Sequence, residues 1–195
     1  MQKQDTGKKL TVSLIVLALT VLAAIITRLT GLETTSAKLI GSFAAVFLLT
    51  GVVWRFPFRF YCMAFGFEVL AAVLGSALNL YHYLGFYDKF VHYTSGIVLA
   101  EGGLILIHAL AGRRHTPAEP LLCRLFSMFF AIAGAGIWEI YEFTADNLLG
   151  INMQGDNTNT MGDIISGTLG ALTWFGIHTL MHKRQQEKQI GRAHV

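Results

Sequence analysis

Residues 10–27 of the chain read LTVSLIVLALTVLAAIIT, and no charged side chain interrupts them. A helix needs about 20 mainly apolar residues to cross roughly 30 Å of hydrocarbon, so this stretch is long enough to span a bilayer. Similar runs recur along the sequence as far as residue 182. The pattern predicts about six transmembrane helices, at about residues 10–27, 39–54, 61–84, 90–110, 121–143 and 161–181.

The composition agrees with a membrane protein. Of the 195 residues, 53% are hydrophobic and 14% are charged, and the mean hydropathy is +0.52. A soluble domain of this size could hardly stay in solution with that balance. The net charge of +3 comes from the N-terminal arm, short loops and the tail rather than from one basic face, so we expect no nucleic-acid partner. Cys62 and Cys123 show no pairing or metal-type spacing.

We therefore expect an all-α fold, a polytopic transmembrane helical bundle that forms a single domain over residues 10–182. Residues 1–9 form a basic arm, and residues 183–195 form a charged tail that we expect to be disordered because it lacks apolar periodicity. A secretory signal peptide also starts with basic residues. The first apolar run is longer than is usual in such peptides, and Arg28 and Glu33 follow it, so a retained anchor is favoured.

The loop charges predict the orientation of the chain, because cytoplasmic loops carry an excess of Lys and Arg. One set of loops and both ends hold Lys3, Lys8, Lys9, Arg55, Arg59, Arg113, Arg114, Lys183, Arg184, Lys188 and Arg192, and Arg124 lies close to one of these loops. The opposite loops hold Arg28, Lys38 and Lys89. Both termini are therefore predicted to be cytoplasmic. No internal repeat is visible, which weakens an interpretation as an inverted-repeat transporter.

Six polar residues at the ends of three predicted helices form the candidate site. They are Asp88 and His92 on the fourth span, Glu139, Glu142 and Asp146 on the fifth, and Asp163 on the sixth. Asp88 and His92 are four residues apart, which places them on one helix face. Glu139, Glu142 and Asp146 are three, four and seven residues apart, so they also share one face. The predicted topology puts all three helix ends at the outer membrane face. We therefore expect these residues to converge there.

Small residues should help the three helices approach one another. Asp163 shares its helix face with Gly167 and Gly170, and Gly96 extends the face of His92. Within a membrane, residues this small let a neighbouring helix backbone come close.

Carboxylates at membrane depth are costly, so several on facing helices need a cation, a proton or a polar substrate between them. Oxygen ligands with one imidazole suit Mg²⁺, Mn²⁺, Ca²⁺ or, less often, Zn²⁺. The leading hypothesis is a divalent metal ion held by His92, Glu139, Glu142 and Asp163. Metal-assisted hydrolysis or transfer on a lipid headgroup or envelope precursor would then use His92 or Glu142 as base. An acid–base site without metal is the alternative, and membrane lipids are the expected partners.

Simpler interpretations exist for several of these residues. Asp88 could form a salt pair with Lys89, and Asp146 and Asp156 could be solvated loop residues. Asp163 could be a helix N-terminal residue that the helix dipole favours.

Other polar residues lie deeper in the predicted spans and suggest other functions. Glu101 faces away from His92 and could pair with Glu68 or bond between helices. In a proton- or cation-coupled transporter, the outer acids would capture a cation while Glu101, Glu68 and His108 pass a proton inward. In a non-catalytic scaffold, the polar groups would only lock helices together. We expect His178 at the membrane interface.

Three blocks carry a family resemblance: YDKFVHYTSG at residues 87–96, WEIYEFTAD at 138–146 and NTNTMGDII at 157–165. They resemble the uncharacterised bacterial inner-membrane family typified by YjdF and, more distantly, the VanZ-like membrane proteins. The third block departs from the family pattern, because Asn159 stands where an Asp is expected and Asp156 is the nearest upstream acid. The resemblance implies a multi-pass protein of the bacterial cytoplasmic (inner) membrane, and the link of VanZ-like proteins with glycopeptide resistance points to the cell envelope.

Overall fold

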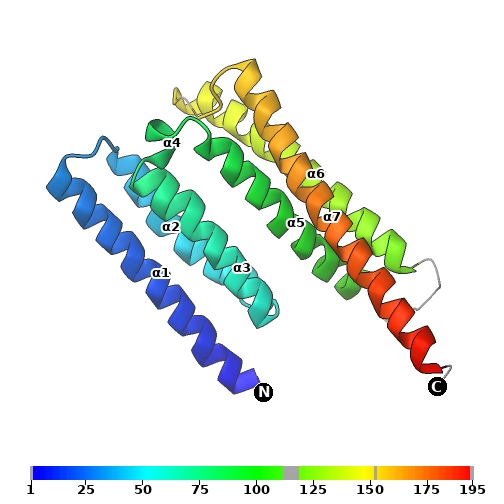
Figure 1. Cartoon of the computed structure of the whole chain (residues 1–195). Helices are drawn as coiled ribbons and strands as arrows, with labels where there is room; N and C mark the ends of the chain where they lie inside the picture. The colour runs from blue at the N-terminus through cyan, green and yellow to red at the C-terminus, as the bar shows by residue number, and fades with distance from the viewer. Residues whose placement is uncertain (1, 112–118, 152, 194–195) are drawn as a thin grey trace. The chain divides into compact units, whose positions relative to one another are not determined.

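The computed structural model describes residues 2–111, 119–151 and 153–193, and within them it contains helices and no strand (Figure 1). The elements are α1 (Gln2–Thr30), α2 (Ser36–Val53), α3 (Phe58–Glu68), the π-helix η1 (Val69–Ala77), α4 (Leu80–Tyr83), α5 (Tyr87–Ala111), α6 (Glu119–Leu149) and α7 (Asn157–Ala193). The predicted all-α fold is confirmed.

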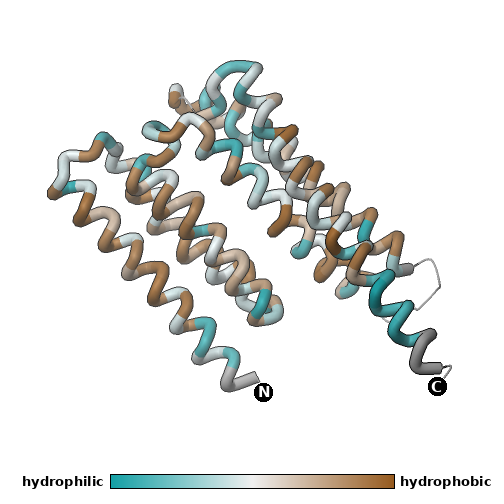
Figure 2. The backbone as a smooth tube through the Cα atoms, in the orientation of Figure 1, coloured by the Kyte–Doolittle hydropathy of each residue, from teal (hydrophilic) through white to brown (hydrophobic). Residues whose placement is uncertain are grey.

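Among the described residues, six helical segments are long and apolar enough to cross a membrane, as the sequence predicted. They are Asp5–Thr30, Ser36–Val53, Phe58–Ala77, Tyr87–Ala111, Pro120–Leu149 and Asn157–Gln189. Figure 2 shows apolar residues along these helices and polar residues gathered toward several of their ends. Six crossings would place the two ends of the chain on one side of the membrane. That this side is cytoplasmic stays a prediction from the loop charges, of which Arg113 and Arg114 lie outside the described residues.

The helices group into two compact units, residues 1–91 and residues 92–195. The boundary falls inside α5, which is one continuous helix, so the first turn of α5 groups with the first unit. The single domain expected over residues 10–182 stays a prediction.

In the first unit, polar side chains close the helix ends and join the helices. Lys9 on α1 donates from Nζ to the carbonyl oxygens of Trp54 and Phe56, at 2.7 Å each. These carbonyls lie at and just beyond the end of α2, where the last turn of a helix leaves acceptors without intrahelical partners. The hydroxyls of Ser13 and Tyr61 are 2.5 Å apart in the buried interior.

The third span ends earlier than predicted. The sequence suggested one helix over residues 61–84, but α3 continues as η1 only to Ala77, and Asn79 then adopts a left-handed conformation with a φ of 60°. Asn tolerates this conformation better than most residues, and its amide bonds nearby groups. Asn79 accepts a 2.7 Å hydrogen bond from Lys38 Nζ and donates to the carbonyl oxygen of Glu33. The apolar run continues through the break, so hydropathy alone did not show it.

In the second unit, α5, α6 and α7 pack around a small apolar core. Its buried members are Ala100, Met128, Ala131, Ala171 and Trp174. On one side of this core, a Cβ atom at Gly96 would overlap the carbonyl oxygen of Gly167, and one at Gly170 would overlap that of Tyr93. The predicted close approach at these glycines is therefore confirmed.

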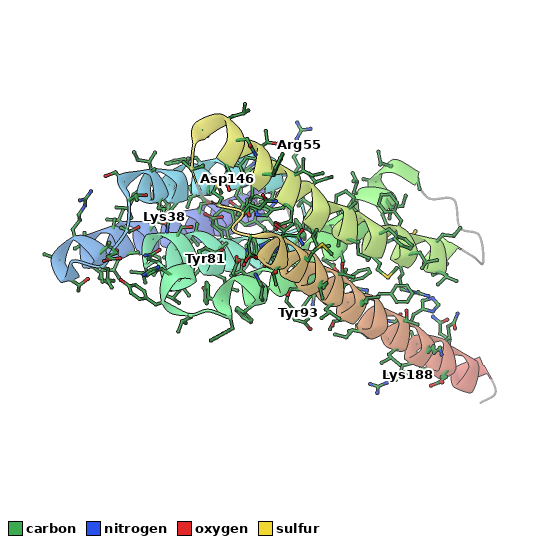
Figure 3. All side chains as sticks on the ribbon, turned by 90° about the horizontal axis from the view of Figure 1, so that it is seen from above. Lys38, Arg55, Tyr81, Tyr93, Asp146 and Lys188 are labelled. Atoms are coloured by element: carbon green, nitrogen blue, oxygen red, sulfur yellow. The ribbon has the colours of Figure 1, made fainter. Side chains whose placement is uncertain are left out.

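The C-terminal segment differs from the expectation of disorder, because α7 runs to Ala193. Gln, Glu, Lys and Arg, which dominate this segment, are good helix formers, and extending an existing helix needs no new nucleus. Figure 3 shows Lys188 on this extension, at the end of the second unit opposite to Asp146.

Candidate metal centre

Three ionisable side chains from three different helices meet inside the second unit. His92 on α5 is 7% exposed, Glu139 on α6 is 3% exposed and Asp163 on α7 is fully buried. The Nε2 atom of His92 lies 3.9 Å from Glu139 Oε1 and 3.8 Å from Asp163 Oδ1. Both distances exceed the usual length of an N–H···O hydrogen bond, about 2.7–3.2 Å. The imidazole therefore faces two carboxylates across a gap wider than a direct bond.

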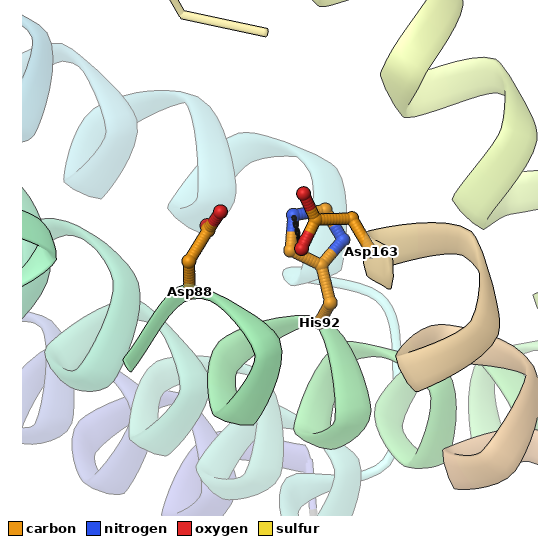
Figure 4. A group of neighbouring side chains, drawn as sticks. All are labelled: Asp88, His92 and Asp163. Carbon is orange, nitrogen blue, oxygen red and sulfur yellow. Dashed lines mark ion pairs between the residues drawn. The ribbon is translucent and has the colours of Figure 1, made fainter. Parts of the chain in front are cut away.

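Asp88 adds a fourth polar side chain from the same helix as His92. It lies one turn before His92 on α5, and Asp88, His92 and Asp163 each offer a ligand atom within 4.8 Å of the others (Figure 4). Lys89 Nζ is 3.5 Å from Asp88 Oδ2, so the predicted salt pair is also present. This pair is partly exposed, whereas His92 and Asp163 are buried.

Asn159 orients the carboxylate of Asp163. Its Nδ2 atom donates a 2.7 Å hydrogen bond to Asp163 Oδ2, one turn further along α7. The main-chain N–H of Asn159 donates to Asp156 Oδ1 at 2.8 Å, so Asp156 caps the start of α7. The sequence had marked Asn159 only as a departure from a family pattern, and its spacing of four from Asp163 was the available signal.

Two of the six predicted site residues have other contacts. Glu142 accepts a 2.8 Å hydrogen bond from Trp138 Nε1 on the same helix. Asp146 accepts hydrogen bonds from the main-chain N–H groups of Met153 and Gln154, at 2.7 and 3.0 Å, and so fastens the loop between α6 and α7. The structure thus brings ligand atoms of Asp88, His92 and Asp163 within 4.8 Å of one another, and it brings Glu139 Oε1 within 3.9 Å of His92 Nε2. Their roles as ligands or catalytic groups stay predictions.

The comparisons with known proteins agree with a membrane protein. Residues 8–184 match a family described as predicted membrane protein (DUF2238). The chain belongs to this family. It is also 31% identical over 125 residues to a Thermotoga maritima protein described as uncharacterized. That match covers 63% of this chain and 59% of the relative, so the chain spans less than two thirds of the relative's length. No solved structure matches the chain.

A second polar group lies further along α5 and α7. Trp174 Nε1 donates a 2.9 Å hydrogen bond to Glu101 Oε2, and His178 Nε2 is 3.4 Å from the same oxygen. The rings of Trp174 and His178 are stacked with centroids 4.0 Å apart. His178 therefore packs against Trp174 and pairs with Glu101. We expected His178 at the membrane interface because it lies close to the charged tail, and the sequence did not show its pairing with Glu101.

Glu68 and His108 are the other polar residues that the sequence singled out. Glu68 is buried in the first unit, and its Oε1 atom has no hydrogen-bond partner among the described residues. His108 is exposed near the end of α5.

The distances at His92 fit a shared metal ion. Two ligand atoms bound at about 2.1 Å to one ion lie at most about 4.2 Å apart. The separations of 3.8 and 3.9 Å from His92 Nε2 to the two carboxylate oxygens fall within this limit. A divalent cation would also offset the cost of burying Glu139 and Asp163 in their charged forms.

Proposed function

We propose that His92, Glu139 and Asp163, with Asp88, hold a divalent metal ion that assists hydrolysis or group transfer on a lipid headgroup or envelope precursor. The observation that carries the proposal is the burial of one imidazole and two carboxylates, from three helices, with ligand atoms 3.8 and 3.9 Å from His92 Nε2. Buried ionisable groups inside membrane helices are costly and usually serve a function.

The donor set favours a hard cation. Three carboxylates and one imidazole suit Mg²⁺ or Mn²⁺, and Zn²⁺ fits less well because carboxylate oxygens dominate. Such an ion polarises a phosphoryl or carbonyl oxygen, or lowers the pKa of a bound water. If His92 is a ligand, Glu142 becomes the candidate base, because it follows Glu139 by three residues on α6.

The position of the group supports a substrate at the membrane boundary. Asp88 lies in the first turn of α5, and Asp163 lies two turns from the start of α7. Both positions are near the ends of spans, at the depth where lipid headgroups begin. The loop charges favour the outer face of a bacterial inner membrane, and the resemblance to YjdF-type and VanZ-like proteins favours the cell envelope.

Titration with Mn²⁺ tests the metal site directly, because free and protein-bound Mn²⁺ differ in their electron paramagnetic resonance signals. The full chain purified in detergent is compared with His92→Ala and Asp163→Asn. We expect about one bound ion per chain in the wild type and loss of binding in both variants. Asp156→Asn is the matched control, because Asp156 caps α7 and Asn caps equally well.

Two results would overturn the metal site. One is a well-folded wild type that binds neither Mn²⁺ nor, by elemental analysis, any other divalent ion. The other is binding that survives both substitutions. Either result leaves a metal-free acid–base site or a scaffold.

A proton- or cation-coupled transporter is the second candidate, and the Glu101–His178 pair favours it. Glu101 follows His92 by nine residues, a rise of about 13 Å along α5. The buried Ala100, Ala131 and Ala171 belong to the apolar core of the unit and offer no proton-carrying side chain. Proteoliposomes with an internal pH dye decide the question: proton flux that Glu101→Gln removes would support transport, and no flux from wild type would reject it.

A further inference from the structure

Two hydrogen-bond donors are buried without acceptors near the Glu101 end of the second unit. They are Arg124 Nε on α6 and Thr179 Oγ1 on α7, and neither atom has a hydrogen-bond partner among the described residues. Leaving a buried donor unsatisfied destabilises the folded state, and more so for a charged group. Two such donors on neighbouring helices indicate a missing acceptor.

The packing of α6 on α7 places the two donors at the same level along the two helices. Gly167 packs on Ala135, where an added Cβ atom would lie 2.9 Å from the Ala135 side chain. Arg124 precedes Ala135 by eleven residues and His178 follows Gly167 by eleven, about three turns in each antiparallel helix. This register places Arg124 opposite His178, and the two side chains interact electrostatically. Thr179 is the next residue after His178.

No carboxylate forms an ion pair with Arg124 within the described part of the chain. The nearby carboxylate, Glu101, is bonded to Trp174 and paired with His178. No ion pair joins Arg124 to it. The expected ligand is therefore an anion with several acceptor oxygens, because a guanidinium binds phosphate through two parallel hydrogen bonds.

The surroundings favour a phosphate that carries acyl chains. Leu121 and Leu122 on α6 and Leu180 and Met181 on α7 are exposed beside the two donors. Lys183 and Arg184 follow on α7 and extend the positive charge. Basic sites between transmembrane helices, at the headgroup level, bind anionic lipids.

We propose that Arg124 and Thr179 bind the phosphodiester headgroup of an anionic phospholipid, whose acyl chains lie against the exposed leucines of α6 and α7. Arg124 supplies the charge and Thr179 donates a hydroxyl hydrogen bond. This lipid site lies three turns of α6 away from the Ala135 contact and shares no residue with the candidate metal centre. The proposal of a lipid site therefore does not depend on metal binding at the candidate metal centre.

Thermal unfolding of the full chain in detergent micelles tests the lipid site. Phosphatidylglycerol is the anionic probe, phosphatidylcholine the zwitterionic one, and inorganic phosphate tests a free anion. We expect phosphatidylglycerol to raise the unfolding temperature by at least about 3 °C more than phosphatidylcholine, because a ligand of the folded state stabilises it. Arg124→Gln should abolish this difference, and Thr179→Val should reduce it. Arg59→Gln, which removes an exposed charge from the first unit, should keep it.

Three results would overturn the proposal. Equal stabilisation by the two lipids would remove the need for a phosphate-specific site. Equal stabilisation by inorganic phosphate would replace the lipid with a free anion. A full phosphatidylglycerol effect in either Arg124→Gln or Thr179→Val would exclude that donor, and Thr179→Val keeps the test open if Arg124→Gln does not fold.

Discussion

Gly170 of α7 lies against the main-chain carbonyl of Tyr93 in α5, so closely that a Cβ atom would overlap the carbonyl oxygen. Gly96 of α5 meets the carbonyl of Gly167 in the same way. These contacts set the separation of the two helices that carry His92 and Asp163. The geometry of the candidate metal centre therefore depends on glycines that offer no ligand.

Gly170→Ala should destabilise the protein by about 1–3 kcal/mol, because the added methyl group forces the two helices apart. Gly176→Ala is the matched control, since nothing lies within 4 Å of a Cβ there and alanine favours a helix. Thermal unfolding in detergent compares the two variants. Equal stability of both would contradict the close contact of α5 and α7.

Lys9→Met should lower the free energy of unfolding by about 1.5–3 kcal/mol, the cost of losing hydrogen bonds from a charged group. Lys9 donates to two carbonyls beyond α2, at 2.7 Å each, and its charge complements that helix end. The neighbouring Lys8 is exposed, so Lys8→Met should change stability little. Denaturation of both variants measures the difference, and a similar loss in both would point to net charge rather than the cap.

Asn79→Ala should be more destabilising than Asn79→Gly. Both variants lose the bonds to Lys38 and Glu33, but only alanine must be forced into the left-handed conformation. That conformation costs a residue with a Cβ atom about 1–2 kcal/mol. Unfolding temperatures of the two variants provide the measurement. If alanine is tolerated as well as glycine, the chain does not need this conformation between η1 and α4.

The sequence predicted the spans well because apolar length alone determines which helices can cross a bilayer. It also placed Asp88 and His92 on one face of α5, because helix periodicity relates residues four apart. The sequence did not show which of Glu139 and Glu142 lies close to His92. Residues three apart differ by about 60° around a helix, so only the packing of α6 on its neighbours decides which one reaches His92.

Other features depended on contacts that no local pattern contains. Asn79 ends the third span inside a continuous apolar run, through bonds to residues about forty positions away. Arg124 fell within the predicted fifth span, but the sequence did not show that it lies near His178 of α7. His178 looked interfacial, and its pairing with Glu101 requires the parallel packing of α5 and α7.

Asn159→Ala should weaken Mn²⁺ binding by about 10–100-fold without abolishing it, since groups that orient a metal ligand have effects of this size. The amide of Asn159 holds Asp163 Oδ2 at 2.7 Å, so its loss frees the carboxylate to rotate. Asn147→Ala is the control, because that exposed amide bonds the carbonyl of Phe143, four residues earlier on α6. Paramagnetic resonance titration gives both affinities. Wild-type affinity in Asn159→Ala, alongside lost binding in Asp163→Asn, would show that Asp163 holds its position without this hydrogen bond.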